Sequence, residues 1–295
     1  DLNTYYLKRS FIKKDIEYVY FPHDTMSSFY GFKEGAFDNF DTIFCSGEHI
    51  KEEIRKTEEV YGLPKKTLVE FGFPLSDYLE EMGNKANEER RKSPKPYKQV
   101  LIAPSWQEDN LLDSCADDLI ASLYGDGYKI IVRPHPEYVK RYGARLSALI
   151  EKYKDADKDK LVFETDFSAN ESVYSSDILI TDWSGVGPEF CFATKRPAIF
   201  VNTKPKCENP NWQKVGIEPV EMSLRKELGE AIGKDEAKNV KAVVEKLLGE
   251  EDLYAKKIAE IYDGFIYNHG TAAENGAKYI LTSLAAKAKQ KKDKK

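Results

Sequence analysis

The chain has 295 residues, of which 41% are hydrophobic and 12% aromatic, enough for substantial cores and, at this length, for two domains. Its net charge of −5 argues against nucleic-acid binding by the whole chain. No stretch approaches the roughly 20 apolar residues of a membrane span, and no signal peptide is visible. The four cysteines lie far apart, without the spacing of a zinc site, and indicate reduced thiols.

Three short apolar runs in the first part of the chain predict β-strands, at 16–21, 42–45 and 68–71. The charged, amphipathic stretch 48–61 predicts a helix, and Ser46 is a suitable N-cap for it. We expect residues 1–90 to form an N-terminal Rossmann-like domain. Because three strands are few for a doubly wound sheet, we expect this domain to be incomplete in the chain. The polar segment 84–98 contains two prolines and predicts a linker.

Predicted strands and helices alternate after the linker. The strands are expected at 100–103, 129–132, 161–163, 178–180 and 198–201. Helices are expected at 117–124, 141–153 and 172–174, and one more between the last two strands. Three further helices are expected at 223–233, 235–248 and 252–267. This alternation predicts a parallel, doubly wound sheet over 95–265. The fold class is therefore α/β, with two Rossmann-like domains.

The end of the chain is predicted to hold a closing helix at 266–286 and a basic tail at 287–295. The tail has six lysines and one aspartate. A disordered, solubilising tail is one interpretation. Contact with an anionic lipid surface is the other, since each lysine near such a surface adds roughly 1 kcal/mol of binding free energy.

Polar residues follow the predicted strands at their carboxyl ends, where parallel sheets bind their ligands. One strand ends in a TDWSG turn at 181–185, directly ahead of a helix. Ser184 and the amide of Gly185 suit phosphate oxygens. Asp182 suits a ribose hydroxyl or the orientation of His135. A helix-capping role for Asp182 or Ser184 is the alternative.

Further strand ends carry groups suited to a nucleotide diphosphate. His135 lies in RPHPE, between two prolines that stiffen the backbone, and Arg133 is close to it. An imidazole and a guanidinium held in this way predict a diphosphate clamp, and a rigid turn with a solvated histidine is the alternative. Ser105, in IAPSW, can donate to phosphate. Glu189, one helical turn after the TDWSG turn, is placed to bind ribose hydroxyls.

The first predicted strand ends in FPHD, which contains His23 and Asp24. His23 is a candidate general base, which requires a reach of about 3 Å to a hydroxyl, and a surface or capping role is the alternative. A DxDxD run at 155–159 lies in a charged stretch and predicts a solvated loop. The histidines are widely spaced, so we expect no metal ion and no cofactor.

These segments together resemble the CDP-glycerol glycerophosphotransferase family, the teichoic-acid primases and polymerases. The resemblance runs from about 18 to 280 and rests on FPHD, EFGFPLSDYL, IAPSW, VRPHPE, SDILITDWSGVGPEFCFATKRPAIF and YNHGTAAENGAKYI, in that order. It implies a GT-B fold, in which two Rossmann-like domains face a cleft. It also implies transfer of a polyol phosphate from a CDP-alcohol to a hydroxyl of a lipid-linked or polymeric acceptor, with release of CMP.

The resemblance also implies roles for single residues. His23 matches the proposed base for the acceptor hydroxyl, and His135 matches the histidine that contacts the donor diphosphate. Thr271 falls in the closing-helix motif, where a hydroxyl can reach the donor. Three residues match the family's TDYSS turn: Asp182, Ser184 and Gly185. The first domain would then bind acceptor and the second the CDP donor, in a cytoplasmic enzyme at the inner face of the cell membrane, without nucleic acid.

The chain departs from the family pattern at several positions. Asp24 stands where the first-domain motif has glycine, and Gln107 stands where the strand-end motif has arginine. Gly185 replaces the second serine of the turn. In the closing motif, His269 stands for an aspartate and Asn275 for an arginine. CDP-ribitol or another CDP-alcohol is therefore an alternative donor to CDP-glycerol.

Two other functions use the same residues. A GT-B glycosyltransferase that takes a nucleotide sugar would have the same fold and the same diphosphate clamp. A non-catalytic homologue would bind the polymer or a partner protein through the same surface. Substitution of His135 separates the last alternative from the two enzymes.

Overall fold

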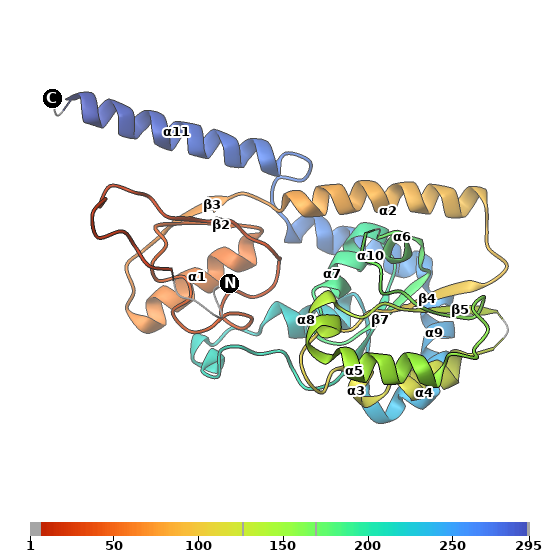
Figure 1. Cartoon of the computed structure of the whole chain (residues 1–295). Helices are drawn as coiled ribbons and strands as arrows, with labels where there is room; N and C mark the ends of the chain where they lie inside the picture. Colours follow the sequence, from red (N-terminus) through yellow and green to blue (C-terminus); the bar gives the residue numbers. More distant parts are fainter. Residues whose placement is uncertain (1–6, 126, 169, 294–295) are drawn as a thin grey trace. The chain divides into compact units, whose positions relative to one another are not determined.

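A computed structural model describes residues 7–125, 127–168 and 170–293 of the chain. The chain forms two compact units, each with its own parallel sheet (Figure 1). Unit 1 comprises Asp1–Asp77, Cys207–Val220 and Tyr262–Lys295, and unit 2 comprises Tyr78–Lys206 and Glu221–Ile261. The predicted α/β class with two Rossmann-like parts is confirmed. The chain passes between the units after residues 77, 206, 220 and 261, whereas the expected boundaries were 90–95 and 265.

Unit 1 contains a three-stranded parallel sheet. Its strands, in spatial order, are β1 (Val19–Tyr20), β2 (Thr42–Cys45) and β3 (Thr67–Glu70). Its helices include α1 (Glu48–Tyr61), the short η1 (Trp212–Val215) and α11 (Ala272–Asp293). The predicted bounds of β2 and α1 agree with the structure. The sequence patterns were clear because β2 is buried throughout, which requires an apolar run, and α1 turns only one face inward, which requires an amphipathic pattern.

Unit 2 contains a six-stranded parallel sheet in the order β6-β5-β4-β7-β8-β9. The strands are β4 (Lys98–Ile102), β5 (Tyr128–Val132), β6 (Leu161–Phe163), β7 (Ile178–Thr181), β8 (Ala198–Asn202) and β9 (Gly229–Gly233). The order runs outward from β4 in one direction and from β7 in the other. The junction of β4 and β7 is therefore the switch point at which open α/β sheets bind their ligands.

Helices cover both faces of this sheet. They are α3 (Leu111–Ser114), α4 (Ala116–Leu123), α5 (Pro136–Lys152), α6 (Glu171–Ser175), α7 (Val186–Thr194), η2 (Lys234–Asn239) and α9 (Val240–Gly249). Three more cross the unit boundaries: α2 (Pro74–Lys92), α8 (Val220–Glu227) and α10 (Glu251–Phe265). In Figure 1, α3, α4, α5 and α9 lie on one side of the sheet, and α6 and α7 lie on the other.

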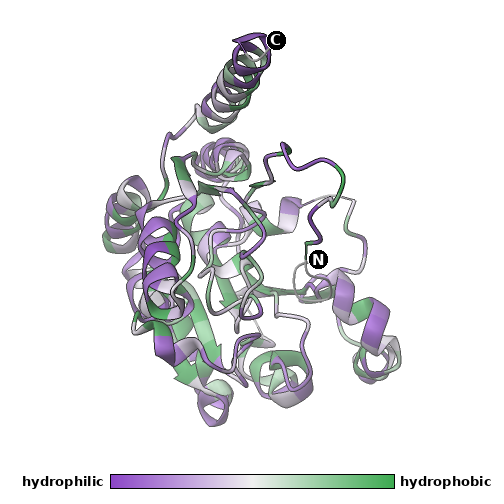
Figure 2. Cartoon of the chain, turned by 90° about the vertical axis from the view of Figure 1, so that its left-hand side faces the viewer, coloured by the Kyte–Doolittle hydropathy of each residue, from purple (hydrophilic) through white to green (hydrophobic). Residues whose placement is uncertain are grey.

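The core of unit 2 forms on both faces of the sheet. Strands β7 and β8 are buried over nearly their whole length, and their side chains pack against apolar residues of α4, α5 and α9. In Figure 2 the strands are mostly green, whereas the helices show purple along much of their length. Continuous apolar runs are expected where a parallel sheet is covered on both faces, which explains why these strands were visible in the sequence.

The last part of the chain completes unit 1. The backbone N–H of Tyr267 donates to the carbonyl of Ser46 at 2.8 Å, and Asn268 donates to the carbonyl of Glu70 at 2.7 Å. Gly47 lies so close to this segment that a Cβ atom there would come within 1.9 Å of the Phe265 carbonyl oxygen. Residues 262–271 therefore pack directly on the ends of β2 and β3.

Several predicted elements differ from the structure. Residues 84–92 belong to α2 rather than to a linker, and residues 287–293 continue α11 rather than forming a disordered tail. The predicted helix 223–233 is α8 followed by β9. Ser46 is not the N-cap of α1. Gly47 occupies that position, and the buried Ser46 hydroxyl has no hydrogen-bond partner among the described residues.

The contact of α2 with α7 predicts a sensitivity to added volume. A Cβ on Gly83 would lie 2.0 Å from the carbonyl oxygen of Ala193, whereas one on Gly143, in α5, would meet open space. We expect Gly83→Ala to lower the free energy of unfolding by about 2 kcal/mol or more, because backbone must move. Gly143→Ala should leave it unchanged or raise it by up to about 1 kcal/mol. Urea unfolding of both variants measures this, and equal effects would contradict it.

Candidate functional site

A cavity of about 350 Å³ lies at the carboxyl ends of the strands of unit 2. Ala103 and Pro104 follow β4, Arg133 to Pro136 follow β5, and Ser184 follows β7. The remaining lining side chains come from α2, the β6–α6 loop, α6 and α7: Leu79, Phe167, Asn170, Val173, Tyr174, Val186 and Glu189. Four of the predicted site residues therefore line one cavity at the switch point: Arg133, His135, Ser184 and Glu189.

His135 lines this cavity and is also the N-cap of α5. Its Nδ1 accepts the backbone N–H of Glu137 at 3.1 Å, so the neutral ring carries its proton on Nε2. Burial and the nearby Lys206 lower the pKa of His135, and Glu137 opposes the shift. The ring is therefore neutral at pH 7 and can donate from Nε2 to an anionic oxygen. The stabilising cap is lost as the pH falls from 6.5 through this lowered pKa, because protonated Nδ1 accepts no hydrogen bond.

Arg133 is held in place by neighbours from the loop after β6. Its Nη1 lies 2.8 Å from the Glu164 carboxylate, and its Nη2 donates to Oδ1 of Asn170 at 2.7 Å. Its guanidinium carbon lies 5.4 Å from the centre of the Phe167 ring. Arg133 is 9% exposed. The guanidinium is thus fixed at the cavity wall, and Glu164 balances part of its charge. The sequence analysis did not predict this ion pair.

The N-terminus of α7 forms another wall. Gly185 is the N-cap, and Ser184 accepts the N–H of Val186 in a long hydrogen bond of 3.4 Å. Both positions are partly exposed, and a Cβ on Gly185 would touch nothing closer than Glu189 Oε1 at 4.0 Å. The first amides of α7 have the positive partial charge that binds phosphate at helix N-termini. In α5 the first N–H groups are already taken, because Pro136 has none and those of Glu137 and Tyr138 donate to His135.

Asp182 has a different position from the predicted one. It is 1% exposed and is not part of the cavity lining. Its Oδ1 accepts the N–H groups of Ser105 and Trp183, each at 2.7 Å, and its Oδ2 accepts the N–H of Leu111 at 3.0 Å. The oxygens of Asp182 are occupied by backbone donors from the loops after β4 and β7, so the structure does not bring Asp182 together with His135 at the cavity, and the predicted ribose contact is not seen.

Ser105 is also buried, with 1% exposure, and does not line the cavity. Its hydroxyl has no hydrogen-bond partner among the described residues, and its carbonyl accepts from Asn110. The predicted phosphate contact of its hydroxyl is therefore not seen. The neighbouring Trp106 does not line the cavity either: Arg141 and Lys206 lie over its ring, at 4.6 and 5.4 Å from the centre.

Arg225 is a supporting residue that the sequence analysis missed. It is 5% exposed, and its Nη1 donates to the carbonyl of Asp182 at 2.8 Å. Its guanidinium carbon lies 4.0 Å from the centre of the Trp183 ring. Nη2 donates to Asn202 at 2.9 Å. Arg225 thus fixes the TDWSG turn from α8, about 40 residues later in the chain, where no sequence spacing reveals the contact.

Two predicted site residues belong to unit 1. His23 follows β1, its side chain is 66% exposed, and its Nδ1 lies 3.0 Å from the Tyr20 hydroxyl. Its Nε2 lies 3.6 Å from the Asp24 carboxylate. Thr271 precedes α11, is exposed, and donates from its hydroxyl to the carbonyl of Asn268 at 3.2 Å. The surroundings of His23 therefore include a hydroxyl and a carboxylate that can orient its ring.

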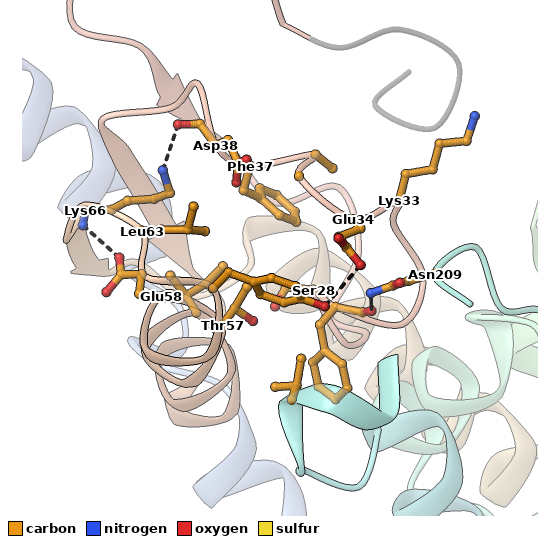
Figure 3. A pocket seen from close by; sticks show the side chains of 16 residues that line it. Ser28, Lys33, Glu34, Phe37, Asp38, Thr57, Glu58, Leu63, Lys66 and Asn209 are labelled. Atoms are coloured by element: carbon orange, nitrogen blue, oxygen red, sulfur yellow. Dashed lines mark hydrogen bonds between the residues drawn. The ribbon is translucent and has the colours of Figure 1, made fainter. Parts of the chain in front are cut away.

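Unit 1 has a cavity of its own, of about 340 Å³, between the loop 28–38 and α1 (Figure 3). Tyr61 donates to Glu34 at 3.1 Å on one side, and Lys66 donates to the carbonyl of Asp38 at 3.0 Å on the other. Lys33 points away from the other labelled side chains in Figure 3. Neither His23 nor Thr271 lines this cavity.

Two α/β units with parallel sheets are the architecture of the GT-B class, and the strand-end cavity with its capping histidine lies where such sheets bind their ligands. The profile of the CDP-Glycerol:Poly(glycerophosphate) glycerophosphotransferase family matches residues 33–281. The chain belongs to this family.

Comparisons with individual proteins agree with the family. Over 171 residues the chain is 27% identical to the teichoic acid glycerol-phosphate primase of Bacillus spizizenii, covering 56% of this chain and 41% of that protein. The wall teichoic acid polymerase TagF has a similar structure, with a TM-score of 0.56 and 20% identity, over 95% of this chain and 70% of that chain.

The fold is shared more widely. An α,α-trehalose-phosphate synthase (UDP-forming) from Burkholderia vietnamiensis has a TM-score of 0.51 and 9% identity, over 86% of this chain and 62% of that chain. Similarity at this level shows the fold and leaves the donor open.

The hydrogen bonds of Asp182 predict that its replacement strongly lowers the free energy of unfolding. Asp182→Ala leaves two buried N–H groups and one partly buried N–H group without an acceptor, so we expect the free energy of unfolding to fall by about 3 kcal/mol or more. Asp155→Ala, in an exposed loop, should change it by less than about 0.5 kcal/mol. Denaturant unfolding followed by circular dichroism measures both. An Asp182→Ala protein as stable as the control would contradict the assignment.

Proposed function

We propose that this chain transfers glycerol phosphate from CDP-glycerol to a hydroxyl of a lipid-linked or polymeric acceptor and releases CMP. The family supports the reaction class. The observation that carries the donor assignment is the cavity in unit 2, where a neutral histidine, a fixed arginine and the N-terminus of α7 converge. Since the chain spans 41% of the curated primase, the donor, acceptor and product are proposals.

The cavity residues suit the diphosphate of the donor. Nε2–H of His135 donates to a phosphate oxygen, and the amides at the start of α7 and the Ser184 hydroxyl bind others. Arg133 adds positive charge at the wall. The acceptor oxygen attacks the phosphorus that carries glycerol, the bond from that phosphorus to the bridging oxygen breaks, and CMP leaves with the bonding electrons. These donors stabilise the charge that develops on the leaving phosphate.

His23 is proposed to take the proton of the acceptor hydroxyl. The Tyr20 hydroxyl holds the ring at Nδ1, so Nε2 is the nitrogen that exchanges a proton with the substrate. The Asp24 carboxylate, 3.6 Å from Nε2, stabilises the imidazolium that forms. Thr271 is proposed, from the family motif alone, to assist donor binding.

Donor binding can be tested through the double role of His135. His135→Asn keeps an N-cap acceptor for Glu137 but removes the Nε2 donor, so we expect an unchanged melting temperature and roughly tenfold or greater weakening of CDP-glycerol binding. His135→Ala should lower both the melting temperature and the affinity for CDP-glycerol, because it removes the N-cap acceptor and the Nε2 donor. Isothermal titration with CDP-glycerol, CDP-ribitol, CMP and UDP-sugars measures binding. Preference for a UDP-sugar would indicate glycosyl transfer, and no binding of any nucleotide to the wild type would favour a non-catalytic homologue.

We also propose that unit 1 meets an anionic membrane surface, as a lipid-linked acceptor requires. Within the described ranges, no helix is long and apolar enough to cross a bilayer. Helix α11 is fixed by one face: Tyr279 and Ser283 both donate to Glu17, at 2.8 and 2.6 Å. On other faces Leu281 and Leu284 are 67% and 59% exposed. The C-terminal end of the helix is strongly hydrophilic in Figure 2 and carries four lysines over 287–292.

The segment before β1 adds a second apolar and basic element to unit 1. Phe11 and Ile12 are 94% and 93% exposed, and Lys8, Arg9, Lys13 and Lys14 surround them in sequence. Two ion pairs tie the end of this segment to α11: Lys291 to Asp15 at 2.8 Å, and Lys287 to Glu17 at 3.0 Å. Apolar side chains among lysines are typical of proteins that bind anionic lipid peripherally.

Vesicle binding tests this surface. We expect the protein to sediment with vesicles of phosphatidylglycerol and phosphatidylcholine but not with phosphatidylcholine alone. The double variant Leu281→Ser/Leu284→Ser should weaken binding about tenfold, because two apolar side chains no longer enter the interface. Leu253→Ser, on α10, changes an equally exposed leucine of unit 2 and should have no effect. Equal loss in both variants, or binding that ignores lipid charge, would contradict the proposal.

A further inference from the structure

The loop that carries His23 is fastened to α1 by two side chains. Residues 23–28 follow β1 without forming a helix or strand. Nε2 of His49 lies 3.0 Å from the carbonyl oxygen of Thr25. One helical turn later, Oε2 of Glu53 accepts both the N–H and the hydroxyl of Ser28, at 2.7 and 2.8 Å. The position of this loop therefore depends on contacts with one face of α1.

Glu53, which binds Ser28 of this loop, is a deeply buried carboxyl group. Its side chain is 1% exposed, and its Oε1 is buried without a hydrogen-bond partner among the described residues. Burial raises the pKa of Glu53 to about 7, although hydrogen bonds from Ser28 and Ser27 lower it, and the charge of Asp24 raises it further. Glu53 therefore exists in both charge states near neutral pH.

The charge of Glu53 acts on the groups around His23. Asp24 interacts with Glu53 and also lies 3.6 Å from Nε2 of His23. The other groups facing Glu53 from the loop are the hydroxyl-bearing Ser27 and Ser28, and His49 contacts the same loop from α1. Since hydrogen bonds to an ionised acceptor are stronger, the carboxylate form holds Ser28 more firmly than the acid form does.

We infer that Glu53 is a positioning residue for His23: its ionised carboxylate holds the loop 23–28 in the arrangement in which Tyr20 and Asp24 orient the imidazole. This inference rests on the proposed role of His23 as the base. It makes activity depend on a buried group that touches no substrate. It also gives the chain a pH response near neutrality that does not originate in a histidine.

The chain offers a matched control on the same helix. Glu58 is 5% exposed, accepts the N–H of Lys66 at 2.8 Å, and pairs with Arg55 at 2.6 Å. Glu53→Gln and Glu58→Gln each replace one buried carboxylate of α1 by an amide of the same shape. Only Glu53 bonds the loop that carries His23.

The test is the pH dependence of CMP release from CDP-glycerol with a synthetic oligo(glycerol phosphate) acceptor. We expect Glu53→Gln to lower kcat at least tenfold at pH 8 with little change in KM for the donor. It should also remove one ionisation from the acid side of the profile, which Glu58→Gln should retain. A wild-type profile in Glu53→Gln would overturn the inference. Ser28→Ala, which removes one donor, should move the same ionisation to higher pH, and an unmoved profile would overturn it as well.

Melting temperatures between pH 5 and 9 give a readout that needs no activity. The raised pKa of Glu53 means that the folded state binds its proton more tightly than the unfolded state does. Wild-type stability is therefore lost as the pH rises from 4.5 through about 7, and Glu53→Gln should lack this loss. A change in the melting curves without any change in kcat would make Glu53 structural only. Full activity of His23→Ala would instead refute the proposed function itself.

Discussion

The site in unit 2 depends on one buried carboxylate. Asp182 accepts backbone N–H groups from the loop after β4, from the start of α3 and from its own turn after β7. These are the two strands that meet at the switch point of the sheet. A charged acceptor at this junction fixes two loops against each other, so the cavity between the strand ends has one shape. Arg225 supports the same turn from the opposite side through the Asp182 carbonyl and the Trp183 ring.

The side chains that face the cavity can bind a ligand while they keep their contacts within the protein. His135 caps α5 through Nδ1 and leaves Nε2 for a ligand. Arg133 is held by Glu164 and Asn170 in a fixed orientation, which reduces the entropy lost when a phosphate binds. Rigid support behind a small number of donors is what electrostatic stabilisation of a leaving phosphate requires.

Much of the fold followed from local patterns, and the failures have local reasons. The buried strand β2 and the one-sided helix α1 are fully specified by their side chains. The segment 84–92 looked like a linker because most of its side chains are exposed charges, of which Lys85 and Lys92 pair along the helix with Glu81 and Glu88. Arg90 instead pairs with Asp177 and Glu251, outside α2. Strand β9, with the sequence GEAIG, has too few apolar side chains to be recognised. At the site, the strand-end rule found the cavity residues, but two of the three backbone donors to Asp182 lie more than 70 residues away. No side-chain pattern encodes them.

The way in which unit 1 is assembled has a consequence for the synthesis of the chain. Its sheet forms from residues before Asp77, yet the carbonyl of Phe265 occupies the space that a side chain at Gly47 would need, and the carbonyl of Ser46 accepts the N–H of Tyr267. Domains tend to fold in the order in which the ribosome releases them. Here β2 and β3 are synthesised before residues 262–271, which pack on their ends, and the residues of unit 2 lie between the two. The ends of β2 and β3 that this segment later covers are therefore uncovered in the nascent chain until residues 262–271 have been synthesised.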